Sequence, residues 1–239
     1  MKFLKLEKRN KISYVSFTRT KSLNALNSQT LKELIDLNKK LENDINTKVV
    51  VYRSEGKNFS AGADIKEQQK KLSKLQIWKS NLGKEAIDSI LKINQITIAS
   101  LRGYCLGGAA CIASACDLRV ASETTLVAYP EIDLGMNLNW FGLPLLLRLI
   151  GPSKTKKMVV SGEIENANDL FKWGFIDEIF NDEELNKKTV ALAKKYASKP
   201  TLPAQMIKRS VNALTYQADQ AIMHMDYDQF LLSREFQEG

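Results

Sequence analysis

Two stretches rich in glycine and alanine decide the fold of this chain: GYCLGGAAC at residues 103–111 (the second turn) and NFSAGAD at residues 58–64 (the first turn). Each follows a β-branched run, at 96–101 and 48–52, that predicts a buried strand, and each leads toward a predicted helix. In such a turn, backbone N–H groups point outward, and glycine lets a ligand approach the main chain. Two turns of this kind can place two N–H donors around one oxygen atom, which is the geometry of an oxyanion hole.

Predicted strands and helices alternate along the first part of the chain. Residues 12–17 alternate apolar and polar side chains and predict a strand that forms a hairpin with residues 3–6. Asn27 is placed to N-cap a helix, and residues 75–93 predict another. The alternation predicts βαβ units and a largely parallel sheet, whereas the patterns after Asn139 predict helices almost throughout.

The domain organisation follows from the absence of linkers. The sequence contains no Ser/Gly-rich linker, no low-complexity tract and no internal repeat. We therefore expect one core domain, residues 1–196, followed by a helical C-terminal region, residues 197–239.

The composition is that of an ordinary globular protein. Of the 239 residues, 44% are hydrophobic, no apolar run is long enough to cross a bilayer, and the N-terminus is too polar for a secretory signal. Three cysteines, Cys105, Cys111 and Cys116, lack metal-type spacing, and their odd number argues against a disulfide scaffold. We therefore expect a reduced, cytoplasmic protein without membrane contact.

The formal charge of +8 has two interpretations. Nucleic-acid binding would require basic residues clustered with aromatic residues, but the lysines are scattered over several predicted helices. We expect solvated helix faces and no nucleic-acid partner; the alternative is attraction of a phosphorylated small molecule such as coenzyme A. The single histidine, His224, nearly excludes histidine triads and histidine-rich metal sites, so no metal is expected.

Five motifs resemble those of the crotonase, or enoyl-CoA hydratase/isomerase, superfamily. They occur in the family's order and spacing: NAL at 24–26, FSAGADIK at 59–66, GYCLGG at 103–108, CDLRVA at 116–121 and PEIDLG at 130–135. The resemblance implies an α/β fold, a crotonase-like spiral of ββα repeats with a helical C-terminal trimerisation region. It also implies a homotrimer or a dimer of trimers that acts on an acyl-CoA thioester and needs no cofactor beyond the coenzyme A of its substrate.

The resemblance assigns catalytic roles to three residues. The backbone N–H groups of Ala63 and Gly108 would hold the thioester carbonyl oxygen, and such a donor typically contributes about 3 kcal/mol to transition-state stabilisation. Glu131 matches the family's second acid/base glutamate. It follows Pro130 in an apolar context, which favours a raised pKa and proton transfer near neutral pH. The alternative for Glu131 is an exposed carboxylate at the end of a loop.

Two positions depart from the pattern of relatives. Cys111 stands where the hydratases carry another glutamate, and a thiol of ordinary pKa is a poor base for positioning water. We expect Cys111 to be a small buried helix residue. Asn139 stands where some relatives place an aspartate, and an amide cannot take a proton at neutral pH. Asn139 could also N-cap a helix before Trp140.

A larger set of residues matches positions that bind substrate or coenzyme A in the family: Lys21, Ser22, Leu23, Ala25, Ser60, Ala61, Gly62, Asp64, Ile65, Lys66, Gly107, Tyr129, Asn139 and Trp140. Lys66 is a candidate phosphate partner or simply a solvated lysine. Aromatic residues such as Tyr129 and Trp140 are more often core than substrate contacts. Residues 226–239 resemble the start of the family's last helix, whose continuation helps to cover coenzyme A. We therefore expect a trimmed chain or a less complete cover.

The number of carboxylates decides the expected reaction. Hydration of a double bond requires two carboxylates around one water, and this sequence supplies one. A single carboxylate can remove a proton at C2 or C4 and return it at the other carbon. We therefore expect an enoyl-CoA isomerase that shifts a double bond from Δ3 to Δ2, with Glu131 as its sole acid/base. The alternatives are an enoyl-CoA hydratase with an atypical site, an acyl-CoA decarboxylase or hydrolase, and a non-catalytic acyl-CoA-binding protein.

Overall fold

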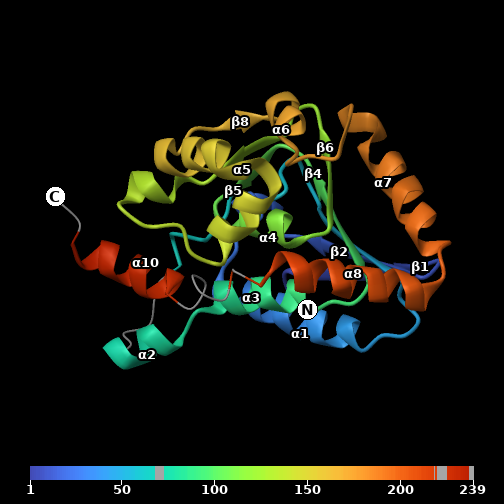
Figure 1. Cartoon of the computed structure of the whole chain (residues 1–239), viewed down its shortest axis with the longest axis horizontal. Helices are drawn as coiled ribbons and strands as arrows, with labels where there is room; N and C mark the ends of the chain where they lie inside the picture. The colour runs from blue at the N-terminus through green and yellow to red at the C-terminus, as the bar shows by residue number, and fades with distance from the viewer. Residues whose placement is uncertain (68–72, 218, 220–224, 237–239) are drawn as a thin grey trace.

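A six-stranded sheet forms the centre of the computed structural model, which describes residues 1–67, 73–217, 219 and 225–236 (Figure 1). His224, Glu238 and Gly239 lie outside the described residues. The strands, in sheet order, are β1 (Leu4–Arg9), β2 (Ile12–Phe17), β3 (Val49–Ser54), β4 (Ile96–Leu101), β6 (Leu118–Ser122) and β9 (Glu178–Phe180). The β1–β2 pair is the predicted hairpin, and the other neighbouring strands are parallel, as the alternation of elements predicted.

Alternate residues of the central strands face two different helical layers. In β3, Val50 and Tyr52 join the larger apolar core, whereas Val49 and Val51 join the smaller one. Because both faces of the sheet are covered, the central strands are continuous apolar runs rather than half-polar ones. The smaller core lies under α7 (Asp182–Ala197). Helices that cover the larger core are α1 (Ser28–Glu42), α3 (Leu82–Leu91), α4 (Gly108–Ala115), α5 (Gly142–Ser161) and α6 (Ala167–Trp173).

A second, three-stranded sheet positions the N-terminus of α4. Its strands, in order, are β5 (Tyr104–Leu106), β7 (Leu126–Ala128) and β8 (Glu165–Asn166). The parallel strands β5 and β7 end together beside α4, where the Gly107 N–H donates a hydrogen bond to the Ala128 oxygen at 2.8 Å. The 3-10 helix η2 (Pro130–Leu134) follows β7 and carries Glu131. The small sheet therefore brings η2 to the start of α4.

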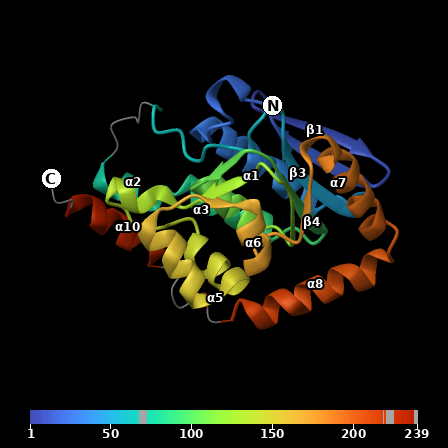
Figure 2. The same ribbon diagram turned by 90° about the horizontal axis from the view of Figure 1, so that it is seen from above.

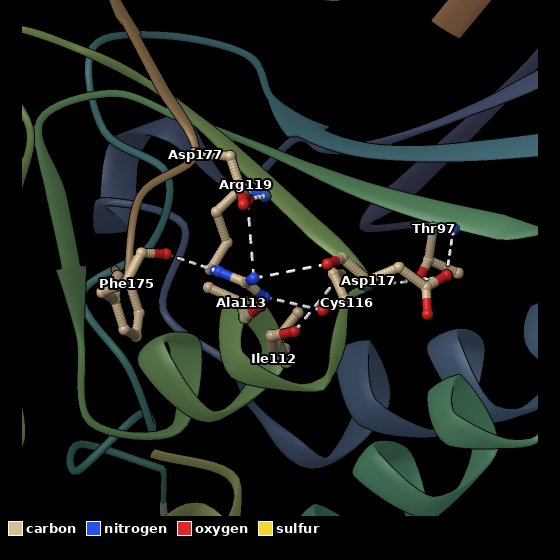
Figure 3. Close-up of polar contacts among 8 residues, drawn as sticks. All are labelled: Thr97, Ile112, Ala113, Cys116, Asp117, Arg119, Phe175 and Asp177. Carbon is tan, nitrogen blue, oxygen red and sulfur yellow. Dashed lines mark hydrogen bonds and ion pairs between the residues drawn. The ribbon is translucent and has the colours of Figure 1, made fainter. Parts of the chain in front are cut away.

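A buried arginine holds the other end of α4 (Figure 3). Arg119 is 3% exposed, and its guanidinium donates hydrogen bonds to the carbonyl oxygens of Ala113, Cys116 and Phe175. A cation at the C-terminal carbonyls stabilises a helix because it complements the helix dipole. Since every residue of α4 is also buried, this helix is a fixed support for the turn at its N-terminus.

The structure differs from the predicted elements in two places. The single helix predicted over residues 75–93 is two helices, α2 (Lys74–Lys79) and α3, because Ser80 is extended and the Asn81 side chain caps α3. The C-terminal half is not all helical either, since β8 and β9 return to the two sheets. These strands of two and three residues are too short to show a period in the sequence.

Two helices complete the described C-terminal region. Helix α8 (Thr201–Thr215) lies at the edge of the molecule, and α10 (Asp226–Glu235) packs on α2 (Figure 2). The helical C-terminal region is thus present, whereas the domain boundary after residue 196 stays a prediction. Among the described residues, no helix is both long and apolar enough to cross a membrane.

Candidate active site

The first and second turns lie directly against each other. Ser60 and Cys105 form a parallel β-bridge between them. Gly62 has a φ of +86°, and a Cβ atom at this position would lie 2.5 Å from the carbonyl oxygen of Leu106. Both the backbone conformation and the close approach require glycine. The two sequence stretches that predicted an oxyanion hole therefore meet in space.

The N–H groups of Ala63 and Gly108 are available to bind an oxygen atom. In the first turn, the Leu26 N–H donates to the Gly62 oxygen at 2.8 Å, and the Asp64 N–H donates to the Leu26 oxygen at 3.0 Å. The Ala63 N–H takes part in neither hydrogen bond. Gly108 is the first residue of α4, where an N–H has no partner within the helix. In the part of the chain that the structure describes, neither N–H donates a hydrogen bond. Their role as oxyanion donors stays a prediction.

Glu131 places its carboxylate over the second turn. A Cβ atom built on Gly107 would lie 2.7 Å from Glu131 Oε1, so the carboxylate stands over the glycine that precedes Gly108. Glu131 Oε2 is buried and has no hydrogen-bond partner within the described residues. Burial raises the pKa of this carboxyl from 4.5 to about 7. A carboxyl with that pKa gains and loses a proton near neutral pH, which is what acid/base catalysis requires.

Cys111 lies one turn further along α4 and is 1% exposed. Its Sγ contacts the main-chain oxygen of Asn139 at 3.8 Å, and Gly142 packs so closely that a Cβ there would lie 2.7 Å from the sulfur. Burial, together with the nearby Glu131 carboxylate, raises the pKa of the thiol well above its ordinary value. Cys111 is therefore a neutral, buried helix residue, as expected.

Asn139 holds the turn before α5 but is not the N-cap of that helix. The N-cap of α5 is Phe141. The Asn139 Oδ1 atom instead accepts hydrogen bonds from the Trp140 N–H and from Asn81 Nδ2, the latter at 3.0 Å. The side chain is 7% exposed, and its amide oxygen already has two donors. The suggested N-cap role is therefore wrong, because the chain makes one more turn before the helix begins.

The indole of Trp140 lies between the starts of two helices. A Cβ atom added to Gly108 would overlap the six-membered ring of the indole, and one added to Gly83, in the first turn of α3, would overlap its five-membered ring. Trp140 is half-buried. The indole and the Glu131 carboxylate thus contact neighbouring glycines of the second turn.

The loop after β2 lies beside the first turn, at the position that the resemblance implied for coenzyme A. The Ala61 N–H donates to the Leu23 oxygen at 3.0 Å, and Arg19 forms an ion pair with Asp64 at 2.9 Å. The candidate residues that are exposed here are Lys21, Ser22, Leu23, Ile65 and Lys66, and Ala25 is half-buried. Sequence reasoning missed Arg19, because its partner is distant in the chain. Asp64 holds the two loops together through this ion pair.

Two candidate substrate contacts face the core instead. Tyr129 is fully buried, and its hydroxyl shares a hydrogen bond of 2.7 Å with Ser114 Oγ. Ser60 is also fully buried, and its Oγ accepts a hydrogen bond from the Gly62 N–H at 3.1 Å. Both side chains support the turns from within and do not line the surface above them. Among the described residues, no group of His, Cys, Asp and Glu side chains is arranged to hold a metal ion.

The family model and the relatives that match this chain point to the same family. A family model described as enoyl-CoA hydratase/isomerase matches residues 7–238. The chain is 32% identical over 209 residues to a short-chain-enoyl-CoA hydratase of Clostridium acetobutylicum and 31% identical over 209 residues to a crotonyl-CoA hydratase of Syntrophomonas wolfei. Each alignment covers 87% of this chain and 80% of the relative.

A solved structure shows the same fold. The crystal structure of a probable enoyl-CoA hydratase from Mycobacterium thermoresistibile has a TM-score of 0.89, with 24% identity and 98% of both chains covered. The predicted crotonase-like fold is therefore confirmed. From the matched family model and these relatives, the chain belongs to the enoyl-CoA hydratase/isomerase family of the crotonase superfamily.

Proposed function

We propose that this protein is an enoyl-CoA isomerase that shifts the double bond of a 3-enoyl-CoA to the Δ2 position. The observation that carries the proposal is the pairing of Glu131, a carboxyl with a pKa of about 7 over the second turn, with a buried, neutral Cys111 where the hydratases carry another carboxylate. A proton shift needs one group that alternates between base and acid. Hydration needs groups that orient and deprotonate a water.

The proposed mechanism uses three groups. The N–H groups of Ala63 and Gly108 bind the thioester carbonyl oxygen and stabilise its negative charge as an enolate forms. Ionised Glu131 takes a proton from C2; the C2–H electron pair enters the conjugated dienolate. Protonated Glu131 then gives the proton to C4, the double bond closes between C2 and C3, and the carboxylate is regenerated.

The pKa of Glu131 suits both halves of this cycle. A carboxyl titrating at about 7 is a stronger base than an ordinary glutamate, yet it is ionised in a large fraction of molecules near neutral pH. Its Oε2 has no hydrogen-bond partner among the described residues.

Hydratase activity is the second candidate. The names of the two relatives, short-chain-enoyl-CoA hydratase and crotonyl-CoA hydratase, favour it. On this reading Glu131 alone would orient the attacking water, since the Cys111 thiol is neutral and 1% exposed.

One spectroscopic experiment separates the candidates. The absorbance of the conjugated enoyl thioester is followed with a 3-enoyl-CoA in one cuvette and a trans-2-enoyl-CoA in another. The proposal expects a rise in the first and no change in the second. A fall in the second would establish hydration and contradict the proposal, and no change in either would favour a decarboxylase, a hydrolase or an acyl-CoA-binding protein.

We also propose that the chain assembles with copies of itself through α8. Large apolar side chains lie exposed along this helix at Leu202, Met206, Ile207, Val211 and Leu214. Exposed apolar surface of this extent is typical of an interface, and the family resemblance implies trimers. Light scattering after size exclusion is expected to show a trimer or hexamer that Ile207→Glu dissociates. A wild-type monomer would contradict this proposal.

A further inference from the structure

The turn that carries Trp140 is held in a conformation that its residues rarely adopt alone. Trp140 and Phe141 both have a φ of 57°, in the left-handed region that large side chains avoid. Such backbone persists where surrounding contacts determine it, and it occurs often at functional sites. Contacts from outside the turn must therefore hold this backbone in place.

Three side chains from two helices supply the support. The Phe141 N–H donates to Asp226 Oδ2, at the start of α10, at 3.0 Å. Asp226 is 5% exposed and forms an ion pair of 3.5 Å with Lys84 of α3, whose ammonium lies 4.7 Å from the centre of the Phe141 ring. Asn81, at the N-cap of α3, binds the Asn139 side chain at 3.0 Å. The turn is thus fixed to α3 and to α10 at once.

What the turn positions is the indole. Its six-membered ring lies against Gly108 and its five-membered ring lies against Gly83, where no Cβ could fit. Gly108 supplies one of the proposed oxyanion donors, so an acyl chain must start at this glycine. In the proposed mechanism C2 to C4 lie beside Glu131, over neighbouring Gly107, so the indole on Gly108 borders the space that is open to the acyl chain. Trp140 is half-buried, whereas Tyr129 is fully buried.

We infer that Trp140 is the end wall of the acyl pocket and restricts the enzyme to short unsaturated acyl-CoA thioesters, with Asp226 as the positioning residue that keeps the wall in place. This inference rests on the proposed use of an acyl-CoA thioester, but not on which reaction follows. Trp140 determines which acyl-chain lengths bind, whereas Glu131 determines which reaction follows.

Binding of saturated, unreactive thioesters tests the wall separately from catalysis. Calorimetry of the full chain with hexanoyl-CoA and dodecanoyl-CoA gives the ratio of their affinities. In the wild type, hexanoyl-CoA is expected to bind more tightly. Each additional buried methylene is worth about a factor of four in affinity, so Trp140→Ala is expected to shift the ratio toward dodecanoyl-CoA by about tenfold or more. Trp140→Phe, which keeps an aromatic ring between the glycines, is expected to shift it less.

Two carboxylates of α10 provide a test variant and a matched control for the positioning role of Asp226. Asp226→Ala removes the partner of the Phe141 N–H and is expected to shift the ratio in the same direction as Trp140→Ala, by a smaller factor. Asp228→Ala removes a carboxylate that bonds to Trp78 at 2.7 Å, and is expected to leave the ratio unchanged.

The outcomes are distinct. An unchanged ratio in Trp140→Ala and Trp140→Phe, or equally tight binding of both thioesters by the wild type, would overturn the inference. Equal effects of Asp226→Ala and Asp228→Ala would overturn the positioning role. Failure to bind either thioester would overturn the inference together with the proposed acyl-CoA substrate. If the absorbance assay shows hydration instead of isomerisation, the proposed reaction fails, while a ratio shifted as expected still upholds the wall.

Discussion

Replacing Glu131 with glutamine is expected to remove a loss of stability that the wild type shows as pH rises, and to remove the activity as well. The folded protein raises the pKa of Glu131 to about 7, whereas the unfolded chain ionises it near the ordinary value of 4.5. Between these values the folded state holds a proton that the unfolded state has lost. The free energy of unfolding therefore falls as pH rises from about 4.5 to about 7 and is constant above it. Glutamine cannot ionise and removes this fall.

The size of the effect follows from the same two values. Each pH unit between them is worth about 1.4 kcal/mol, so the wild type loses about 3 kcal/mol across the interval and the Glu131→Gln variant does not. An unpaired amide at the buried Oε2 position has a cost of its own. That cost is the same at both ends of the pH range and cancels in the difference.

The assay is urea unfolding of both proteins at pH 5 and pH 8, at one fixed protein concentration. The difference in unfolding free energy, variant minus wild type, is expected to be larger at pH 8. Glu123→Gln, which changes an exposed glutamate in the turn between β6 and β7, serves as the control and is expected to follow the wild type. Identical pH dependence of the wild type and Glu131→Gln would refute the reasoning that burial raises this pKa.

Two further predictions concern rate and backbone. For isomerisation, kcat/KM is expected to rise with pH as Glu131 ionises, with a midpoint near its pKa of about 7, and then to stay level; a midpoint near 4.5 would contradict a buried base. Gly62→Ala is expected to lower both stability and rate, because a left-handed backbone costs alanine about 1–2 kcal/mol and the added Cβ meets the Leu106 oxygen. Gly151→Ala also places an alanine at positive φ, but no atom lies within 4 Å of the added Cβ, so it should lower stability in urea unfolding and leave kcat unchanged. Equal rates in both variants would contradict the role given to Gly62.

The fold could be predicted from the sequence wherever the deciding pattern is local. The glycine-rich turns after β-branched runs predicted two strand–turn–helix units, and the structure brings these turns together. The apolar sequence context of Glu131 predicted its raised pKa, and burial is what raises it. Composition and spacing are sufficient for features of this kind.

Contacts between distant segments could not be predicted in this way. The sequence near Asp226 shows only an acidic helix start, yet its carboxylate holds the Phe141 N–H, 85 positions earlier. Tyr129 was expected to contact substrate, and its hydroxyl bonds to Ser114 in the core instead. Asn81, where the predicted helix breaks, also bonds to the Asn139 side chain, a contact that no periodicity shows. Each outcome is decided by tertiary packing rather than by local preference.

The central claim, that one carboxylate carries the acid/base chemistry, is tested most directly by two variants in one assay. The kcat for isomerisation of a 3-enoyl-CoA is measured for Glu131→Gln and Cys111→Ala. The account predicts a loss of about a thousandfold for Glu131→Gln, typical of a removed general acid/base, and no change for Cys111→Ala. A Glu131→Gln variant that keeps the wild-type rate, or a Cys111→Ala variant that loses as much, would contradict it.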